Sequence, residues 1–372
     1  MRTQSVEPPR SDVPPVLAGL LRDAVLLVER GTATPTDIDT AMRLGAGHPA
    51  GPFEVLASLP PDVRRELGPP TTLPPGRVGA PRFSADGGGW TGPVGVSGTG
   101  HMAGGIVEAV ARSGRPVRVL ARSRQSGQRL LDALSSRLDR AVSRGRIEAA
   151  GRTEVLGRVS VTEDPAALAD ADVVIEAVAE DLDAKAAVVR LLDAALPTAV
   201  PLATNTSSFR VRDLRPFVTS GRPVVALHFF NPAQVMELVE VVVPDDLRGA
   251  DELRSTASAW VRALSKTPIA CADSRGFVVN RLLIPFLNDA VRLHETGVPA
   301  PEVDELLRSA AGHPMGPLAL IDLIGIDVTV AALQSMAAVE DDPRISPATT
   351  LHQLAAAGRL GRKTGAGFHD YP

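Results

Sequence analysis

The chain has 372 residues, of which 44% are hydrophobic and 22% charged, and its formal net charge is −4. This composition is typical of a globular protein with two or three domains and excludes disorder over the whole length. With 39 basic and 43 acidic residues, there is no basic excess that would attract nucleic acid or an anionic membrane. The single cysteine, Cys271, excludes an internal disulfide and a cysteine-rich zinc site, so we expect no metal.

The N-terminal segment, as far as Pro15, is polar and rich in proline. It lacks the apolar stretch of a signal peptide and the amphipathic pattern of a transit peptide, and no run approaches the roughly 20 apolar residues of a membrane span. We therefore expect a cytoplasmic protein without a membrane partner. Apolar residues at helical spacing run from Leu17 to Val28, and a turn at Gly31 precedes a second helical stretch from Pro35.

A stretch rich in proline and glycine follows these helices. Eight prolines and seven glycines lie between Pro60 and Pro93, a density that no packed helix or strand would tolerate. We therefore predict a tail at 1–12, a helical unit at 13–58 and a linker at 59–92.

Short valine-rich runs alternate with helical patterns in the next part of the chain. The runs are at 93–97, 117–121, 173–178, 200–203, 224–229 and 238–243. Such runs, separated by helices, are typical of a parallel sheet covered on both faces, so we predict a doubly wound, Rossmann-type α/β domain at 93–273. The pattern is all-helical beyond it, with apolar stripes at 278–293, 303–311 and 318–338, which predicts an all-α domain at 274–372.

The N-terminal helical unit contains an internal repeat of the C-terminal domain. LLRDAVLLVERG at 20–31 resembles FLNDAVRLHETG at 286–297, and GHPAGPF at 47–53 resembles GHPMGPL at 312–318. The offsets are 266 and 265 residues. Because the GHPxGP string is shared, chance similarity between two helices rich in Ala and Leu is a poor explanation, and we interpret 13–58 as a partial second copy.

The sequence VGVSGTGHMAGGI at 94–106 forms a glycine loop between a strand and a helix. Gly98 allows a tight turn, Gly100 allows the backbone to approach a pyrophosphate, and the small Ala103 allows helix and strand to pack closely. Met102 lies beside Ala103 in the same loop. We therefore predict a dinucleotide site formed by these four residues.

The end of the second strand indicates which dinucleotide is bound. An Asp or Glu there would bind the ribose 2′-hydroxyl of NAD, but this chain has Ala121, followed by Arg122, Ser123 and Arg124. Two guanidinium groups and a hydroxyl would hold a 2′-phosphate, so the pattern favours NADP(H) over NAD(H). The alternative is that both arginines are solvated surface charges.

Seven further blocks, in order along the chain, resemble the signatures of the 3-hydroxyacyl-CoA dehydrogenase family. They are DADVVIEAVAEDLDAK at 170–185, NTSS at 205–208, HFFNP at 228–232, MELVEVV at 236–242, GFVVNRLL at 276–283, GHPMGP at 312–317 and GRKTGAGF at 361–368. The resemblance implies an NAD(P)-binding domain, a helical domain that mediates dimerisation, and catalysis in the cleft between them.

The resemblance assigns proton transfer to His228, at the end of an apolar strand. A histidine has a pKa suited to proton exchange near neutrality, so it would be the base for alcohol oxidation and the acid for ketone reduction. Glu240 is implied to orient His228 and to stabilise its imidazolium form. Glu237 is a competitor for this role, but the ungapped match to the family favours Glu240.

Other site residues are implied by the same matching. Ser207 and Asn280 resemble residues that hydrogen-bond the reacting oxygen or hold the nicotinamide, and Asn231 resembles a contact near both substrate and cofactor. The remaining matches are Glu180, Lys185 and Lys363 as cofactor contacts, and Arg144 and Arg146 as contacts to the adenosine phosphate of CoA.

We therefore predict an L-3-hydroxyacyl-CoA dehydrogenase that prefers NADP(H), with NAD(H) as the other candidate, and that acts on short substrates such as 3-hydroxybutyryl-CoA and acetoacetyl-CoA. The same chemistry on an acyl-carrier-protein thioester or a hydroxy acid is one alternative. A catalytically silent, crystallin-like dinucleotide-binding protein is another, and the joint presence of Ser207, His228, Glu240 and Asn280 argues against it.

The partial repeat cannot complete an active site of its own, because Pro14 answers to Asn280 and no glycine loop precedes it. We expect it to pack on the C-terminal domain and to cover the surface through which the family dimerises. This hypothesis predicts a monomeric pseudo-dimer, with a homodimer as the alternative.

Overall fold

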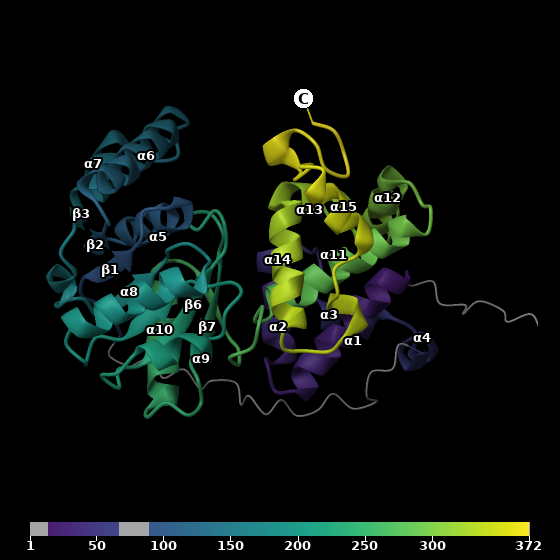
Figure 1. The fold of residues 1–372 in the computed structure, drawn as a ribbon, viewed down its shortest axis with the longest axis horizontal. Coiled ribbons are helices and arrows are strands. Elements are labelled where there is room, and N and C mark those ends of the chain that lie inside the picture. The colour runs from purple at the N-terminus through teal and green to yellow at the C-terminus, as the bar shows by residue number, and fades with distance from the viewer. Residues whose placement is uncertain (1–13, 67–88, 372) are drawn as a thin grey trace, which may run out of the picture. The chain divides into compact units, whose positions relative to one another are not determined.

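The computed structural model describes residues 14–66 and 89–371, which form two compact units (Figure 1). Within these ranges, unit 1 contains residues 14–30, 46–66 and 279–371, and unit 2 contains residues 31–45 and 89–278. The predicted tail at 1–12 and residues 67–88 of the predicted linker lie outside the described residues.

Unit 2 is built on one eight-stranded sheet with the order β3-β2-β1-β4-β5-β6-β7-β8. The strands are β1 (Val94–Ser97), β2 (Val117–Leu120), β3 (Val159–Thr162), β4 (Val173–Glu176), β5 (Leu202–Thr204), β6 (Val224–Phe229), β7 (Leu238–Val242) and β8 (Thr267–Ala270). The order runs outward in both directions from the β1–β4 pair, which is the doubly wound arrangement. The predicted Rossmann-type sheet is thus confirmed.

Helices cover both faces of this sheet. One face packs on α5 (His101–Arg112), α6 (Arg124–Ser143), α7 (Ala149–Gly157) and α10 (Ala250–Ala263). The other face packs on α8 (Leu182–Ala195) and the short helix η1 (Pro165–Leu168), with α9 (Val211–Leu214) and η2 (Arg215–Phe217) beside α8. Because both faces are buried, the inner strands consist of apolar residues in continuous runs, which is the pattern that predicted them.

One strand pair departs from the predicted parallel sheet, since β7 is antiparallel to β6. Only residues 230–237 connect these two strands, and a parallel crossover needs a longer connection, usually a helix. The chain therefore turns back directly, and this reversal fixes the pairing of β6 with β7.

Three local features differ from the predicted division of the chain. Most of α2 (Pro35–Ala46) belongs to unit 2, where the Ala272 amide donates to the Thr32 carbonyl at 2.7 Å. The helix α4 (Pro61–Glu66) lies within the predicted linker, and Trp90 packs on Trp260 in the core of unit 2. The units also divide between 278 and 279 rather than between 273 and 274.

Unit 1 is entirely helical. Besides α4 it contains α1 (Pro15–Glu29), α3 (Pro52–Ser58), α11 (Val279–Glu295), α12 (Ala300–Ala311), α13 (Pro317–Ile324), α14 (Ile326–Ala337) and α15 (Thr349–Ala356), with the short helices η3 (Pro343–Ile345) and η4 (Arg362–Thr364). The single stripe predicted at 318–338 is two helices, because Gly325 has a φ of 111° and the chain bends by 95° there. No single described helix is long and apolar enough to span a membrane. Helices α13 and α14 reach that length and apolar composition only when taken together as this bent pair.

The N-terminal repeat packs on the C-terminal copy through equivalent residues. Helix α1 lies along α11 (Figure 1, purple and green). A Cβ built on Gly47 would lie 3.9 Å from Pro314, and one built on the equivalent Gly312 would lie 3.3 Å from the equivalent Pro49. The equivalent rings of His48 and His313 stack with their centroids 4.0 Å apart. Such reciprocal contacts are those of a two-fold interface, here formed within one chain.

The Arg344 guanidinium joins the two copies at this seam. Arg344 lies 2.8 Å from Asp23 and 2.5 Å from Asp289, and these aspartates are equivalent at the offset of 266 residues. Burial raises the pKa of Asp23, and the charges of Arg344 and Arg281 oppose this rise. Arg344 therefore stabilises the ionised form of a carboxyl group that is almost fully buried.

We expect Arg344→Met to lower the free energy of unfolding by about 3 kcal/mol, because it leaves Asp23 buried without its nearest cation. Arg308→Met is the matched control, since Arg308 and its partner Glu305 are mostly exposed, and a change of about 0.5 kcal/mol or less is expected. Urea unfolding of the three proteins at pH 7 measures both values, and equal effects would contradict the role given to Arg344.

Candidate functional site

The glycine loop after β1 has the geometry of a phosphate-binding turn. Gly98 has a φ of +131°, and a Cβ built on it would lie 2.5 Å from the Ala177 carbonyl oxygen. Gly100 precedes α5 as its N-cap, and a Cβ built there would meet no protein atom within 4 Å. Fold packing therefore requires glycine at position 98, whereas glycine at position 100 leaves open space in front of a helix N-terminus.

A cavity of about 1060 Å³ opens in front of this loop. Its walls come from the glycine loop and α5, from the ends of β2 and β4, from Glu163 after β3, and from one face each of α6 and α8. Residues predicted for the cofactor that line it are Gly98, Gly100, Met102 and Arg122, together with Ala121. Ala103 is fully buried behind the loop, where its small side chain allows α5 to pack on the sheet.

Ser123 and Arg124, which follow Arg122, are not among the residues lining the cavity. Ser123 caps α6, since its hydroxyl oxygen accepts a hydrogen bond from the Ser126 amide at 3.2 Å. Arg124 is exposed in the first turn of α6, and it is not among the residues lining the cavity. Of the three residues predicted for a 2′-phosphate, Arg122 alone lines the cavity.

Sequence reasoning missed two further arginines on the cavity wall, Arg129 and Arg137. Arg137 donates to Glu108 at 2.8 Å and to the Gly104 carbonyl at 3.0 Å, so it braces α5 against α6. Arg129 is exposed on the same face of α6 as Ser126 and Ala133. Its spacing of three residues from Ser126 and four from Ala133 is the signal that could have found it.

These features fit a nicotinamide dinucleotide. Amides at a helix N-terminus and the space left by Gly100 suit a pyrophosphate, and the volume is at the upper end for small-molecule sites. Gly98 and Gly100 would hold the pyrophosphate, and Arg122 and Arg129 would lie on the wall formed by β2 and α6.

A buried histidine and a buried glutamate form a second group of functional side chains in unit 2. His228 on β6 and Glu240 on β7 are directly opposite each other in the antiparallel pair. Their atoms Nδ1 and Oε2 are 2.6 Å apart, and the other glutamate oxygen accepts from the Val278 amide at 3.0 Å. The exposed fraction is 5% for His228 and 0% for Glu240. Glu237, the competing carboxylate, is exposed.

A network of carboxylates and one lysine fixes the NTSS loop. The Lys185 ammonium group is 3.0 Å from Glu176 and 3.1 Å from Glu180. Glu180 in turn accepts hydrogen bonds from the amides of Ser207 at 2.9 Å and Ser208 at 2.7 Å, and from the Thr206 hydroxyl at 2.6 Å. Burial acts to raise the pKa of Glu180, but the charge of Lys185 and these hydrogen bonds outweigh it, and the pKa is lowered.

This network gives a structural role to Lys185 and Glu180, which the sequence predicted as cofactor contacts. Lys185 is only 1% exposed and its ammonium group is already paired with two carboxylates, so it holds Glu180 in position from the protein interior. Glu180 in turn shapes the backbone around Ser207, whose hydroxyl is 3.3 Å from it. Sequence reasoning missed Glu176, at the end of β4, because its role depends on the burial of Lys185.

The remaining predicted residues are spread over both units. Asn231 follows β6, is exposed, and is joined to Pro232 by a cis peptide bond. Arg144 and Arg146 are exposed at the end of α6. Asn280 lies in the first turn of α11 in unit 1, and Lys363 in η4 pairs with Asp327 at 2.5 Å in that unit.

Comparison with known families matches most of the chain. The family model described as "3-hydroxyacyl-CoA dehydrogenase, NAD binding domain" matches residues 93–274. The model described as "3-hydroxyacyl-CoA dehydrogenase, C-terminal domain" matches two segments, residues 13–68 and 276–371. The first of these segments includes the one interpreted from the sequence as a partial repeat.

Curated proteins and solved structures agree with these matches. The 3-hydroxybutyryl-CoA dehydrogenase of Clostridioides difficile is 37% identical over 282 residues, which are 74% of this chain and 98% of that protein. The 3-hydroxyadipyl-CoA dehydrogenase of Escherichia coli is 39% identical over 75% of this chain and 58% of that protein. The crystal structure of M. tuberculosis FadB2 superposes with a TM-score of 0.71 at 36% identity, covering 75% of this chain and 98% of that chain.

We expect Gly98→Ala and Gly100→Ala to separate folding from dinucleotide binding. Gly98→Ala puts a Cβ against the Ala177 carbonyl at a positive φ, so it should lower the free energy of unfolding by about 1–3 kcal/mol. Gly100→Ala meets no protein atom, so stability should change by about 0.5 kcal/mol or less while the affinity for the reduced nicotinamide dinucleotide falls. Urea unfolding and fluorescence titration with NADH and with NADPH measure the two effects; unchanged affinity for both dinucleotides in Gly100→Ala would contradict the assigned site.

Proposed function

Because the chain belongs to the 3-hydroxyacyl-CoA dehydrogenase family, we propose that it transfers a hydride between NADP(H) and C3 of a short (3S)-3-hydroxyacyl-CoA or 3-oxoacyl-CoA. The observation that carries the proposal is the hydrogen bond of 2.6 Å between the buried His228 and Glu240. Relatives named 3-hydroxybutyryl-CoA dehydrogenases support the short acyl chain.

The residues of this chain supply the proton chemistry of the reaction. Because a carboxylate can only accept a hydrogen bond, Nδ1 of His228 carries the proton shared with Glu240, and Nε2 is the nitrogen free to accept the substrate hydroxyl proton. The resulting imidazolium is stabilised by the ionised Glu240, whose second oxygen is held by the Val278 amide. The bound nicotinamide supplies or accepts the hydride.

Ser207 is the donor proposed for the reacting oxygen. Its amide donates to Glu180 at 2.9 Å, which restricts the backbone of the loop before any substrate binds. Its hydroxyl donates to Glu180 at 3.3 Å, and because serine has a single O–H it must turn away from Glu180 to donate to the reacting oxygen, while the backbone that carries it stays fixed. The resemblance adds Asn280 and Asn231 to this oxygen- and nicotinamide-binding set, and Lys363 to the cofactor contacts.

The preference for NADP(H) rests on charge. The dinucleotide cavity has no carboxylate at the end of β2, where Ala121 stands, and it has Arg122 and Arg129 on the adjoining wall. A 2′-phosphate would form charge-assisted hydrogen bonds with these guanidinium groups, whereas the 2′-hydroxyl of NAD would leave them without an anion. Arg144 and Arg146 are the residues proposed for the adenosine phosphate of CoA.

We expect faster turnover of acetoacetyl-CoA with NADPH than with NADH. Arg122→Ala should lower kcat/KM for NADPH by about 10- to 100-fold and leave the value for NADH little changed, because it removes contacts specific to the phosphate. Arg124→Ala is the control, since Arg124 does not line the cavity. Absorbance of the reduced nicotinamide measures the turnover rates of wild type, Arg122→Ala and Arg124→Ala. Faster turnover of wild type with NADH than with NADPH would contradict the cofactor assignment. Turnover of acetoacetyl carrier protein but not of acetoacetyl-CoA would contradict the proposed substrate.

We expect Glu240→Gln to lower kcat by about 10²- to 10⁴-fold, because an amide can neither neutralise the imidazolium nor hold the same tautomer. Glu237→Gln removes the competing carboxylate three residues away and should leave kcat near the wild-type value. Equal losses in both variants, or none in Glu240→Gln, would contradict the dyad.

We also propose that the protein is a monomer in which the N-terminal repeat takes the place of a partner subunit. The reciprocal contacts of Gly47 with Pro314 and of Gly312 with Pro49 support this proposal, as does the packing of α1 on α11. A face already covered from within the chain is not free to bury its apolar area against a second copy.

Light scattering coupled to gel filtration tests the monomer directly. The expected mass is that of one chain, 38.9 kDa, at every concentration loaded. A mass of two chains that persists on dilution would contradict the proposal.

A further inference from the structure

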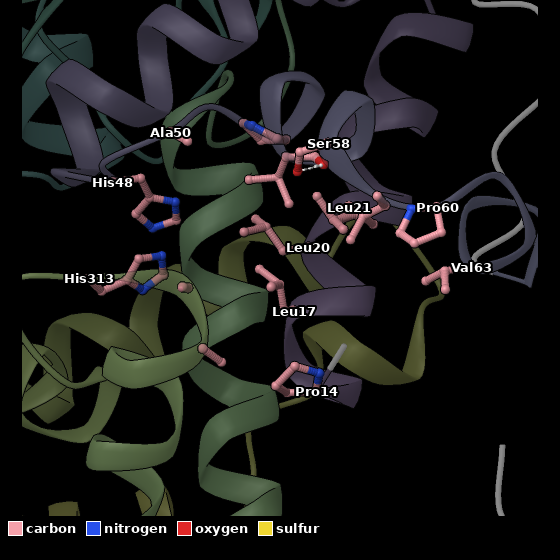
Figure 2. A pocket seen from close by; sticks show the side chains of 15 residues that line it. Pro14, Leu17, Leu20, Leu21, His48, Ala50, Ser58, Pro60, Val63 and His313 are labelled. Atoms are coloured by element: carbon pink, nitrogen blue, oxygen red, sulfur yellow. Dashed lines mark hydrogen bonds between the residues drawn. The ribbon is translucent and has the colours of Figure 1, made fainter. Parts of the chain in front are cut away.

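Unit 1 contains a cavity of about 320 Å³ at the seam between the two repeats (Figure 2). Figure 2 shows the imidazoles of His48 and His313 at one end, leucines of α1 in the middle, and Pro60 and Val63 at the other end. Both imidazoles therefore lie at one end of the cavity, and the other lining side chains are apolar except for Ser58. None of its lining residues belongs to the proposed dehydrogenase site.

The two histidines are the only titratable side chains among the described residues that line this cavity. They are 7% and 9% exposed, and both line the cavity. Imidazole nitrogens that line a cavity can hydrogen-bond a molecule bound in it.

The cavity arises from an asymmetry between the repeats. The Phe286 ring packs edge-on against both imidazoles, with centroid distances of 5.9 Å to His48 and 5.6 Å to His313. Its equivalent at the offset of 266 residues is Leu20, which lines the cavity and has no ring to fill it. One side of the histidine stack is thus filled by an aromatic ring, and the other side is left open.

We propose that this cavity binds an aliphatic monocarboxylic acid of about ten to twelve non-hydrogen atoms, with its carboxyl group at His48 and His313 and its chain along Leu17, Leu20 and Leu21. The size follows from a volume about twice that of a cavity of roughly 150 Å³ that holds a benzene ring. Octanoate is the probe that matches this length and chemistry.

The charge state of the histidines fixes how the carboxyl group binds. Burial and the neighbouring His313 lower the pKa of His48 to about 3, and burial lowers the pKa of His313, so both rings are neutral at pH 7. A neutral imidazole offers one acceptor nitrogen and one N–H donor, which match the O–H and C=O of a carboxyl group. We expect octanoate to bind as the neutral acid and to take up one proton, so its affinity should fall about tenfold for each pH unit above 7.

Calorimetric titration of the full chain with sodium octanoate tests the proposal. We expect binding in wild type, and a loss of at least tenfold in affinity in Leu20→Phe, which places in the cavity the ring that Phe286 provides on the other side. Leu26→Phe is the matched control, because Leu26 lies on the same helix, is exposed, and does not line the cavity. Val63→Trp fills the opposite end and should give the same loss if Leu20→Phe does not fold.

Two measurements separate this cavity from the dehydrogenase site. Glu240→Gln, and wild type saturated with NADP⁺ and acetoacetyl-CoA, a pair that cannot react, should bind octanoate with unchanged affinity. Octan-1-ol should bind more weakly and without dependence on pH. Absence of octanoate binding, binding that survives both filling variants, or equal and pH-independent binding of the alcohol would overturn the proposal.

Discussion

The chemistry of unit 2 depends on a carboxylate that has no contact with solvent. Glu240 is 0% exposed, and an ion in such surroundings is tolerated only when both oxygens have partners. The reversal of β7 against β6 supplies one partner by setting Glu240 opposite His228, and the Val278 amide supplies the other. Because the sheet fixes both strands, the imidazole is held at Nδ1 and only Nε2 is left for proton exchange. One antiparallel strand in a mostly parallel sheet thus determines which nitrogen of His228 can act.

The same requirement for paired charges shapes the loop that carries Ser207. Lys185 is buried between Glu176 and Glu180, and Glu180 collects the amides of Ser207 and Ser208. The position of a proposed catalytic hydroxyl therefore depends on a lysine that lies out of contact with solvent. A change at Lys185 would act on both stability and activity, because it would leave two carboxylates without a cation and release the loop.

The sequence predicted the elements whose burial leaves a strong pattern. Six strands were found because strands buried on both faces consist of continuous apolar runs, whereas β3 and β8 are the two edge strands and are partly exposed. The bond between His228 and Glu240 was expected only through the family resemblance, since valine runs do not reveal strand direction. The cap formed by Ser123 and the burial of Lys185 were missed, because both depend on contacts that residue types do not specify. Arg129 was not predicted, because the spacing that sets Ser126, Arg129 and Ala133 on one face of α6 was not recognised as a cavity wall.

The repeat shows how a truncated copy can cover an interface without reproducing it. Equivalent residues meet at the seam, as the stacking of His48 on His313 and the sharing of Arg344 by Asp23 and Asp289 show. In a true two-fold dimer both sides of such a stack would be identical, so an open space on one side would also exist on the other. Within one chain the two sides can differ, and Leu20 in place of a second phenylalanine leaves space beside the two imidazoles. Joining both copies in one polypeptide therefore removes the symmetry constraint, and a cavity can form on one side while the other stays packed.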